Sequence, residues 1–216
     1  MELLSILPVL IFSIIVHEVA HAWVALLEGD DTAYQLGRIT LNPFAHLDLV
    51  GSFLVPVVLY SVTDGMIFGW AKPVPIDPRK FRSYKSADIK VSLAGIVANI
   101  FLALVLTVLI VVLLNVQGIA DGGDYAGLVV NIVYFGIYIN LILAFFNLIP
   151  LPPLDGSHVL YHFIPTNWRF RYNQIGQYGI VILLMCSILY PELFTFILKP
   201  VQMIIGLVDS VIVSWT

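Results

Sequence analysis

The first apolar run of the chain, residues 3–27, is the feature that most constrains what this sequence can form. It is long enough to cross a bilayer as a helix, and its only ionisable residues are His17, Glu18 and His21. Ionisable side chains inside a membrane helix are costly, so they mark a functional site by default. An unpaired glutamate in lipid costs several kcal/mol, which argues against a chance match.

The spacing of these three residues indicates a metal site. On a helix, His17 and His21 lie one turn apart on the same face and can bind one metal ion together. Glu18 follows the first histidine and can reach a metal-bound water instead of the metal. This is the H-E-x-x-H pattern, in which two imidazoles hold zinc and the glutamate takes a proton from the water. We therefore expect Zn²⁺ as cofactor, with one ion per chain.

The composition is that of an integral membrane protein. Of the 216 residues, 60% are hydrophobic and only 11% are charged, which is well outside the globular norm. By length we expect one integral-membrane domain, residues 1–216. The single cysteine, Cys186, excludes an internal disulfide and a thiolate metal cluster. We expect the lipid bilayer as a partner and no nucleic acid, and the sequence leaves homo-oligomerisation open.

The other apolar runs predict an all-α polytopic membrane protein with about five to six transmembrane helices. Residues 91–114 and 126–149 are each long enough for a span. Residues 175–190 form a further apolar stretch, and residues 193–215 fit either a final span or an interfacial helix.

A small membrane-associated β-sheet with a re-entrant loop is expected after the first helix. Residues 37–42 and 72–77 are predicted to form two strands that could pair. Residues 51–67 have a short charge-free core that contains Pro56. We interpret them as a re-entrant or interfacial loop, although the sequence does not decide whether they cross the membrane.

The placement of charge predicts the orientation. Basic residues gather at 79–90 and at 169–171, which the positive-inside rule places in the cytoplasm. The acidic segment 115–125 is then outside, so that residues 126–149 run inward and Asp155 lies near the cytoplasmic face.

A catalytic zinc site needs three protein ligands and an open position for water. The candidates for the third ligand are Asp155, His46, His158 and His162. Asp155 is favoured because it follows a proline-broken helix end at the right depth and precedes Gly156. Non-helical backbone at membrane depth is tolerated where it lines a cavity, and a hydrolytic water needs a cavity.

The chain resembles the site-2 protease family of intramembrane zinc metalloproteases, in particular short bacterial-type members without appended PDZ or CBS domains. The matching segments are His17-Glu18-Val-Ala-His21, Asn147-x-x-Pro150-x-x-x-Leu154-Asp155-Gly156, residues 37–43, His46-Leu-Asp48, residues 69–75 and Ala94-Gly95-x-x-x-Asn99. One departure is visible: Ile96 stands where members of the family commonly have proline. This bears on helix geometry near Asn99 more than on the chemistry.

The resemblance implies that His17, His21 and Asp155 bind zinc and that Glu18 is the general base. Asn147 would help to hold the scissile carbonyl or its oxyanion. We also expect a prokaryotic inner or plasma membrane, and the distribution of basic residues places the active site toward the cytoplasmic side.

Further polar and strand residues are candidates for lining the site or docking the substrate. His46 either lines the site or is a hydrogen-bonded loop histidine. Asn99 and Asn140 either line the site or join helices, a common use of asparagine in membranes. Docking of an unwound substrate as an added strand is expected at Ile39, Leu41 and Val74.

The favoured function is hydrolysis of a peptide bond within or near the transmembrane segment of a membrane-anchored protein. The alternatives are a metal transporter or sensor, which needs polar residues distributed along several spans, and a non-catalytic scaffold, which needs a ligand or the base to be missing. Substrate identity, the trigger of cleavage and the oligomeric state are not encoded in any motif. Nitrogen and oxygen ligands also accept cobalt or iron, so the ligand types alone do not prove zinc.

Overall fold

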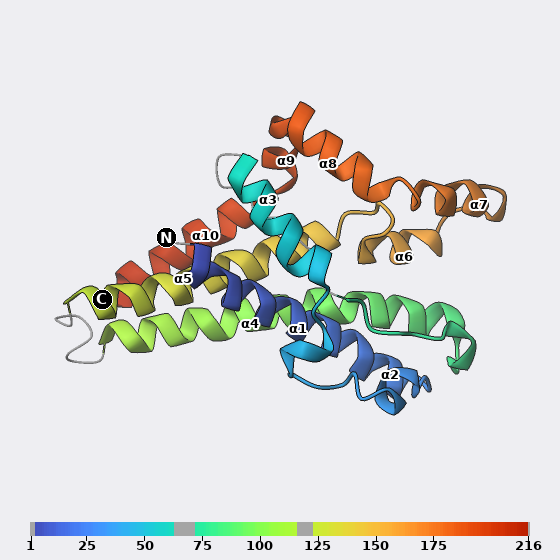
Figure 1. Cartoon of the computed structure of the whole chain (residues 1–216), viewed down its shortest axis with the longest axis horizontal. Helices are drawn as coiled ribbons and strands as arrows, with labels where there is room; N and C mark the ends of the chain where they lie inside the picture. The colour runs from blue at the N-terminus through green and yellow to red at the C-terminus, as the bar shows by residue number, and fades with distance from the viewer. Residues whose placement is uncertain (1–2, 63–71, 116–122, 216) are drawn as a thin grey trace. The chain divides into compact units, whose positions relative to one another are not determined.

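A computed structural model describes residues 3–62, 72–115 and 123–215 of the chain (Figure 1). The described residues form helices and irregular segments, which confirms the all-helical fold class. The chain divides into two compact units, residues 1–95 and 96–216, and each is described by itself. That residues 1–216 act as a single domain stays a prediction.

The first unit is built on helix α1, Leu3–Leu27. Gly29 ends this helix with a backbone φ of 111°, a conformation that side-chain-bearing residues rarely adopt. The amide of Asp30 then donates to the carbonyl oxygen of Ala25 at 2.9 Å. Oδ1 of Asp30 in turn accepts from the amide of Thr32 at 3.0 Å, where the short helix α2, Thr32–Gln35, begins.

The rest of the first unit consists of short elements that lead to helix α4, Tyr84–Asn115, whose first part belongs to this unit. These elements are η1 (Pro43–Ala45), η2 (Val50–Leu54), α3 (Val55–Val62) and η3 (Pro78–Lys80). One apolar core joins α1 to the start of α4 and consists of Ala25, Phe81, Ala87 and Val91. A second joins α1, α2 and residues 72–77 and consists of Ala22, Ala33 and Val74.

The second unit contains the rest of α4 and the helices that follow it. These are α5 (Gly123–Asn147), α6 (Asp155–Tyr161), α7 (Thr166–Ile175), α8 (Gly179–Leu189), α9 (Pro191–Ile197) and α10 (Lys199–Trp215). Its core joins α4, α5 and α10 and consists of Ala103, Ile110, Val133, Ile137, Leu141, Val201 and Val208. The hydroxyl of Tyr134 on α5 also donates to Oδ1 of Asp209 on α10 at 2.9 Å.

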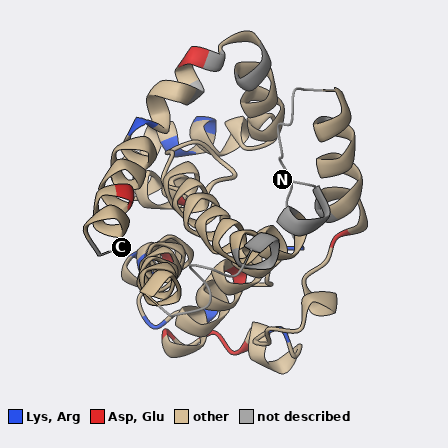
Figure 2. Cartoon of the chain, turned by 90° about the vertical axis from the view of Figure 1, so that its left-hand side faces the viewer, with Lys and Arg blue, Asp and Glu red and all other residues tan. Residues whose placement is uncertain are grey.

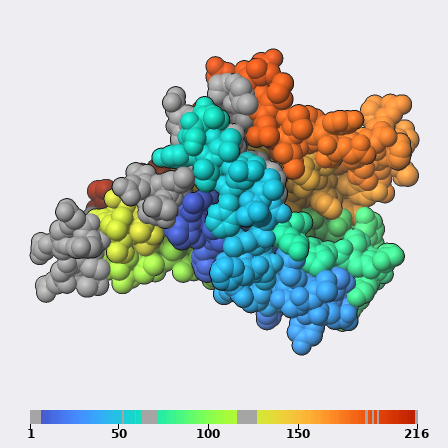
Figure 3. Space-filling view, viewed as in Figure 1, coloured from blue at the N-terminus to red at the C-terminus, as the bar shows by residue number. Residues whose placement is uncertain are grey.

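Within the part of the chain that the structure describes, three helical segments are long and apolar enough to cross a membrane: Leu7–Leu27, Tyr84–Asn115 and Gly127–Asn147. Charged residues are sparse on the ribbon (Figure 2). Helix α3, cyan in Figure 3, exposes Val57, Val58 and Val62. Helices α8 and α10 have 11 and 17 residues, against the ~20 residues of a typical span, so the predicted count of five to six spans is not confirmed.

The predicted pair of strands is not confirmed either, because neither 37–42 nor 72–77 is a strand in the described part of the chain. Pro73 and Pro75 have no N–H to donate to a ladder. The amide of Lys72 donates to the carbonyl oxygen of His46 at 2.9 Å. Nη2 of Arg38 donates to the carbonyl oxygen of Lys72 at 2.9 Å. The backbone of Lys72 thus forms its hydrogen bonds with a loop carbonyl and a side chain instead of with a partner strand.

The segment predicted as a re-entrant loop, residues 51–67, is described as far as Val62. Helix α3 has 8 residues, which is too few for a crossing on its own. Residues 63–67 of this prediction, and residues 69–71 of the matching segment 69–75, lie outside the described residues.

Candidate metal centre

Helix α1 places His17 and His21 on one face with their rings turned toward each other. Both side chains are buried, with 7% of each residue exposed. Their Nε2 atoms lie 3.0 Å apart, and the ring planes meet at 85°. Two nitrogen ligands of one tetrahedral zinc lie about 3.3 Å apart, given zinc–nitrogen bonds of about 2.0–2.1 Å. The two imidazoles therefore have a spacing close to that of a shared ion.

The backbone of α4 orients the His21 ring. Nδ1 of His21 lies 2.7 Å from the carbonyl oxygen of Val91. A carbonyl oxygen only accepts, so Nδ1 carries the proton, and in the neutral ring Nε2 has the lone pair. Metal-bound histidines commonly donate their second ring N–H in this way, because it sets the tautomer and the orientation. The donor set of the first unit thus fits a metal ion.

His17 packs directly against a glycine of α4. A Cβ built at Gly95 would lie 2.5–2.6 Å from three atoms of the His17 ring, closer than real Cβ contacts allow. Any side chain at position 95 must therefore displace the imidazole or the helix. Gly95 was part of a matching segment, but nothing in its spacing along the sequence indicated that it faces His17.

Glu18 is half-buried and accepts a hydrogen bond from the backbone of a segment far away in the sequence. Its Oε2 accepts a hydrogen bond from the amide of Val74 at 2.8 Å. Val74 lies in residues 72–77, which we call the strap. Its side chain is 7% exposed and packs with Ala22 and Ala33, so the strap is attached to α1 by packing as well as by Glu18.

The remaining predicted residues of the first unit lie in its loops. His46 is 1% exposed, and its Nε2 donates to the carbonyl oxygen of Thr40 at 2.8 Å. This is the geometry of a hydrogen-bonded loop histidine. Ile39 is half-buried and packs on the core that contains Val74, whereas Leu41 is 57% exposed.

In the second unit, Asp155 is the first residue of α6 and is half-buried. Gly156 lies so close to the carbonyl oxygen of Leu148 that a Cβ there would overlap it. Glycine at this position therefore permits the tight return from the end of α5. Helix α7 supports the same turn, because the hydroxyl of Tyr172 donates to the carbonyl oxygen of Pro150 at 2.9 Å.

Asn147, at the end of α5, donates from Nδ2 to the carbonyl oxygen of Leu143 at 2.9 Å. Asn140 makes the same kind of bond to Gly136 at 2.8 Å and is fully buried, as is Asn99. His158 is exposed, whereas His162 is 6% exposed beside the ring of Tyr161.

The first unit thus brings together His17, Glu18, His21 and Val74. The second places Asn147 and Asp155 at either end of one braced turn.

Outside the spans, ion pairs surround the end of the strap. The guanidinium of Arg79 lies 2.8 Å from Oδ2 of Asp77 and lowers the pKa of that carboxyl from 3.8 to about 2. Nζ of Lys80 lies 2.6 Å from Oδ1 of Asp31, which lowers the pKa of Asp31 and raises that of Lys80. These groups therefore stay ionised throughout the physiological pH range.

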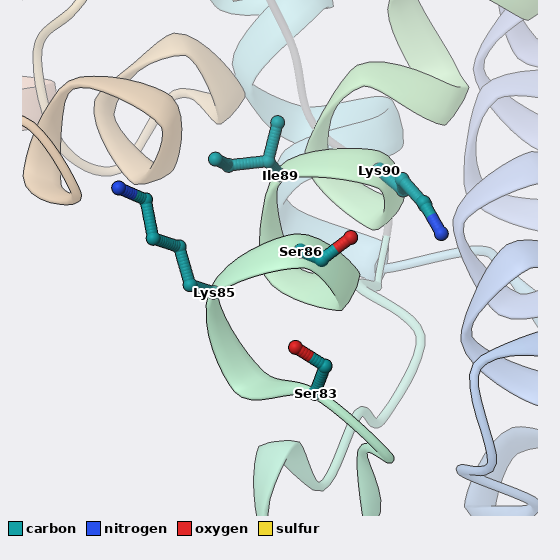
Figure 4. Close-up of a pocket in the computed structure, with 5 residues that line it drawn as sticks. All are labelled: Ser83, Lys85, Ser86, Ile89 and Lys90. Carbon is teal, nitrogen blue, oxygen red and sulfur yellow. The ribbon is translucent and has the colours of Figure 1, made fainter.

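The start of α4 forms a pocket of different chemistry, lined by Ser83, Lys85, Ser86, Ile89 and Lys90 (Figure 4). Lys85 and Lys90 extend to opposite sides of the helix. Nζ of Lys90 lies 2.7 Å from Oε1 of Glu28, so this lysine already has a counter-ion. The lining contains no imidazole or carboxylate, so this pocket is not a second metal centre.

A histidine pair with an adjacent carboxylate, inside a helix of membrane-spanning length, is typical of a membrane metalloprotease. Residues 116–189 match Peptidase family M50. The chain is 38% identical over 186 residues to YwhC of Bacillus subtilis (strain 168), which covers 84% of this chain and 81% of the relative. It is 38% identical over 71 residues to MJ0611 of Methanocaldococcus jannaschii, or 33% of this chain and 32% of the relative. Both carry the name "Putative zinc metalloprotease".

No solved structure gives a significant match to the chain. The extent of the similarity to YwhC shows the family: the chain belongs to peptidase family M50, the site-2 proteases, and is a membrane zinc metalloprotease.

Proposed function

We propose that this metalloprotease hydrolyses a peptide bond within or near the transmembrane segment of a membrane-anchored protein. The observation that supports this most is the pair of buried imidazoles, 3.0 Å apart at Nε2, beside Glu18 on a helix that can span a bilayer. Ionisable groups are costly inside a membrane helix, and hydrolysis of a substrate that lies in the membrane would explain why the helix contains them.

His17, His21 and Asp155 would hold the zinc, since two imidazoles and one carboxylate are a common catalytic set that leaves a position open. When bound, the zinc supplies a Lewis acid that acidifies water and polarises a carbonyl. The carboxylate of Glu18 takes a proton from the attacking water and returns it to the leaving amine nitrogen as the peptide C–N bond breaks.

Asn147 donates a hydrogen bond to the carbonyl oxygen as negative charge develops on it. Its side-chain amide has two N–H groups, and the bond to Leu143 uses one of them. The second N–H is the donor that the mechanism assigns to the oxyanion.

A transmembrane substrate must unwind locally, because its carbonyls are otherwise held in helical hydrogen bonds. An extended substrate beside residues 37–42 would satisfy the freed backbone groups. Leu41 is 57% exposed, whereas Val74 is buried and Ile39 is half-buried, so we assign docking to the backbone around Leu41.

Leu41→Pro is therefore expected to slow cleavage several-fold without loss of zinc, because proline removes a backbone donor. Leu41→Ala, which shortens the side chain and keeps the amide, is the matched control. Equal cleavage rates for the proline and alanine variants would reject docking at this segment.

The proposed location is a prokaryotic inner or plasma membrane, with the active site toward the cytoplasm. The basic segment 79–90 supports this orientation. A cysteine placed at Lys85 in a Cys186→Ser background should react with an impermeant thiol reagent only from the cytoplasmic side. Reaction from the outside would show that the protein has the opposite orientation in the membrane.

The function is tested with purified protein in vesicles that also contain a single-span substrate tagged at both ends. Mass spectrometry of the two fragments should place the cut within or next to the span. A zinc chelator such as phenanthroline should stop the reaction, and added zinc should restore it. Cleavage that continues in the chelated sample, or a cut only in a soluble tag, would overturn the proposal.

A further inference from the structure

Three backbone amides of the strap, residues 72–77, donate hydrogen bonds to the rest of the first unit. At its start, the amide of Lys72 donates to His46. In its middle, the amide of Val74 donates to Oε2 of Glu18 at 2.8 Å. At its end, the amide of Asp77 donates to Oδ2 of Asp30 at 2.6 Å. The middle contact is the one that touches the proposed general base.

Asp30 is the most buried carboxylate among the described residues of this unit, with 1% of the residue exposed. Its Oδ1 accepts from the amide and the hydroxyl of Thr32, at 3.0 and 2.5 Å. Its Oδ2 accepts from Asp77, and Nζ of Lys80 lies 3.9 Å from Oδ1. A buried charge is costly unless it is satisfied in this way, and here the donors come from both α2 and the strap.

Backbone rotation is restricted around the middle of the strap. Prolines at positions 73 and 75 flank Val74 and fix their own φ angles. Between Val74 and Asp77, the φ angle of Pro75 is fixed and the side chain of Ile76 packs against both apolar cores of the unit, so we expect a displacement at Asp77 to reach Val74.

We propose that Asp30 is a positioning residue for the general base. By holding the amide of Asp77, it holds the strap in the place where the amide of Val74 meets the carboxylate of Glu18. The inference rests on the role of Glu18 in the proposed function, and it assigns to Asp30 no contact with substrate or metal.

Asp30→Asn is the variant that can keep the hydrogen bonds to Thr32 while it loses the one from Asp77. Asparagine can keep its carbonyl oxygen toward Thr32, but its NH₂ group then faces the amide of Asp77, and two donors repel each other. Asp31→Asn is the matched control, because it removes the same charge one residue further along. The carboxylate of Asp31 bonds Lys80 and Gln35 and does not contact the strap.

Amide hydrogen exchange, resolved at Val74 and Asp77 by mass spectrometry in detergent, is the first readout. Asp30→Asn should speed exchange about tenfold or more at both amides, the effect of one lost hydrogen bond carried along the strap. Asp31→Asn should change neither. Faster exchange at Asp77 with unchanged exchange at Val74 would reduce Asp30 to a local structural role and overturn the proposal.

Glu18→Ala tests the same coupling from the other side and leaves Asp30 intact, so the test survives if Asp30→Asn does not fold. Coupling between two sites is reciprocal, so exchange should rise at Asp77 as well as at Val74. Unchanged exchange at Asp77 would contradict a strap that moves as one piece.

Cleavage kinetics give the second readout. Asp30→Asn should lower kcat by up to about 100-fold, the cost of a misplaced catalytic group, with KM and zinc content unchanged. A rise in KM at unchanged kcat would overturn the positioning role. If the wild type cleaves no substrate, the proposed function fails, whereas exchange at Val74 still decides whether Asp30 holds the strap on Glu18.

Discussion

Glu18→Gln is expected to abolish proteolysis while leaving zinc bound. Glutamine has the shape of glutamate, and its side-chain oxygen can still accept from the amide of Val74, so the contact with the strap survives. It cannot take a proton from water at neutral pH. Loss of general-base catalysis lowers rates by about 10²- to 10⁴-fold, which is the expected fall in the initial rate of substrate cleavage in vesicles.

The matched control for this variant is Glu28→Gln. Glu28 lies just beyond the end of α1 and pairs with Lys90 at 2.7 Å, so the same chemical change there should leave the rate unaltered. The zinc content of each sample shows whether a loss of activity comes from the missing general base or from a missing zinc ion. If Glu18→Gln cleaves at a rate similar to Glu28→Gln, Glu18 is not the base. A transporter or a scaffold would be little affected by either change.

Gly95→Ala should weaken zinc binding and slow cleavage. The added Cβ would lie 2.5–2.6 Å from three atoms of the His17 ring, so the ring or α4 must move. Overpacking of this kind costs about 1–3 kcal/mol, and a displaced imidazole no longer shares an ion with His21. We expect zinc affinity to fall at least about tenfold, measured by competition with a chelating dye.

Gly127→Ala is the control for that experiment. Gly127 also lies in a helix of membrane-spanning length, but a Cβ there would meet no atom within 4 Å. This variant should keep its zinc and its activity, which excludes a general effect of alanine on helix insertion. Full zinc content in Gly95→Ala would show that a side chain at position 95 does not prevent His17 from binding zinc.

The histidine pair was predictable because it depends on the geometry of one helix alone. Residues four apart share a face of any α-helix, and the apolar run makes α1 a helix on length and composition alone. The turn before Asp155 was similarly predictable, since its prolines end α5 and Gly156 permits the close approach to Leu148. Both depend on contacts that are local in sequence.

The contacts that set up the site around α1 were not predictable, since they join segments far apart in the chain. Alternation and prolines in residues 72–77 suggested a strand, but such a pattern does not say which groups receive its amides. Glu18 and Asp30, rather than a neighbouring strand, accept from the strap. Likewise, a glycine in a long apolar helix has many uses, and only the packing of α4 on α1 identifies Gly95 as the neighbour of His17.

The most direct test of this account is the zinc content of the purified wild-type protein and of Asp155→Ala, measured by mass spectrometry after removal of free metal. The account predicts about one zinc per chain in the wild type, and its loss or severe weakening in the variant, because a catalytic site needs three protein ligands. His158→Ala, an exposed histidine of the same helix, should keep its zinc. Full zinc retention in Asp155→Ala would contradict the proposed ligand set and assign the third position to another side chain, with His46 as the next candidate.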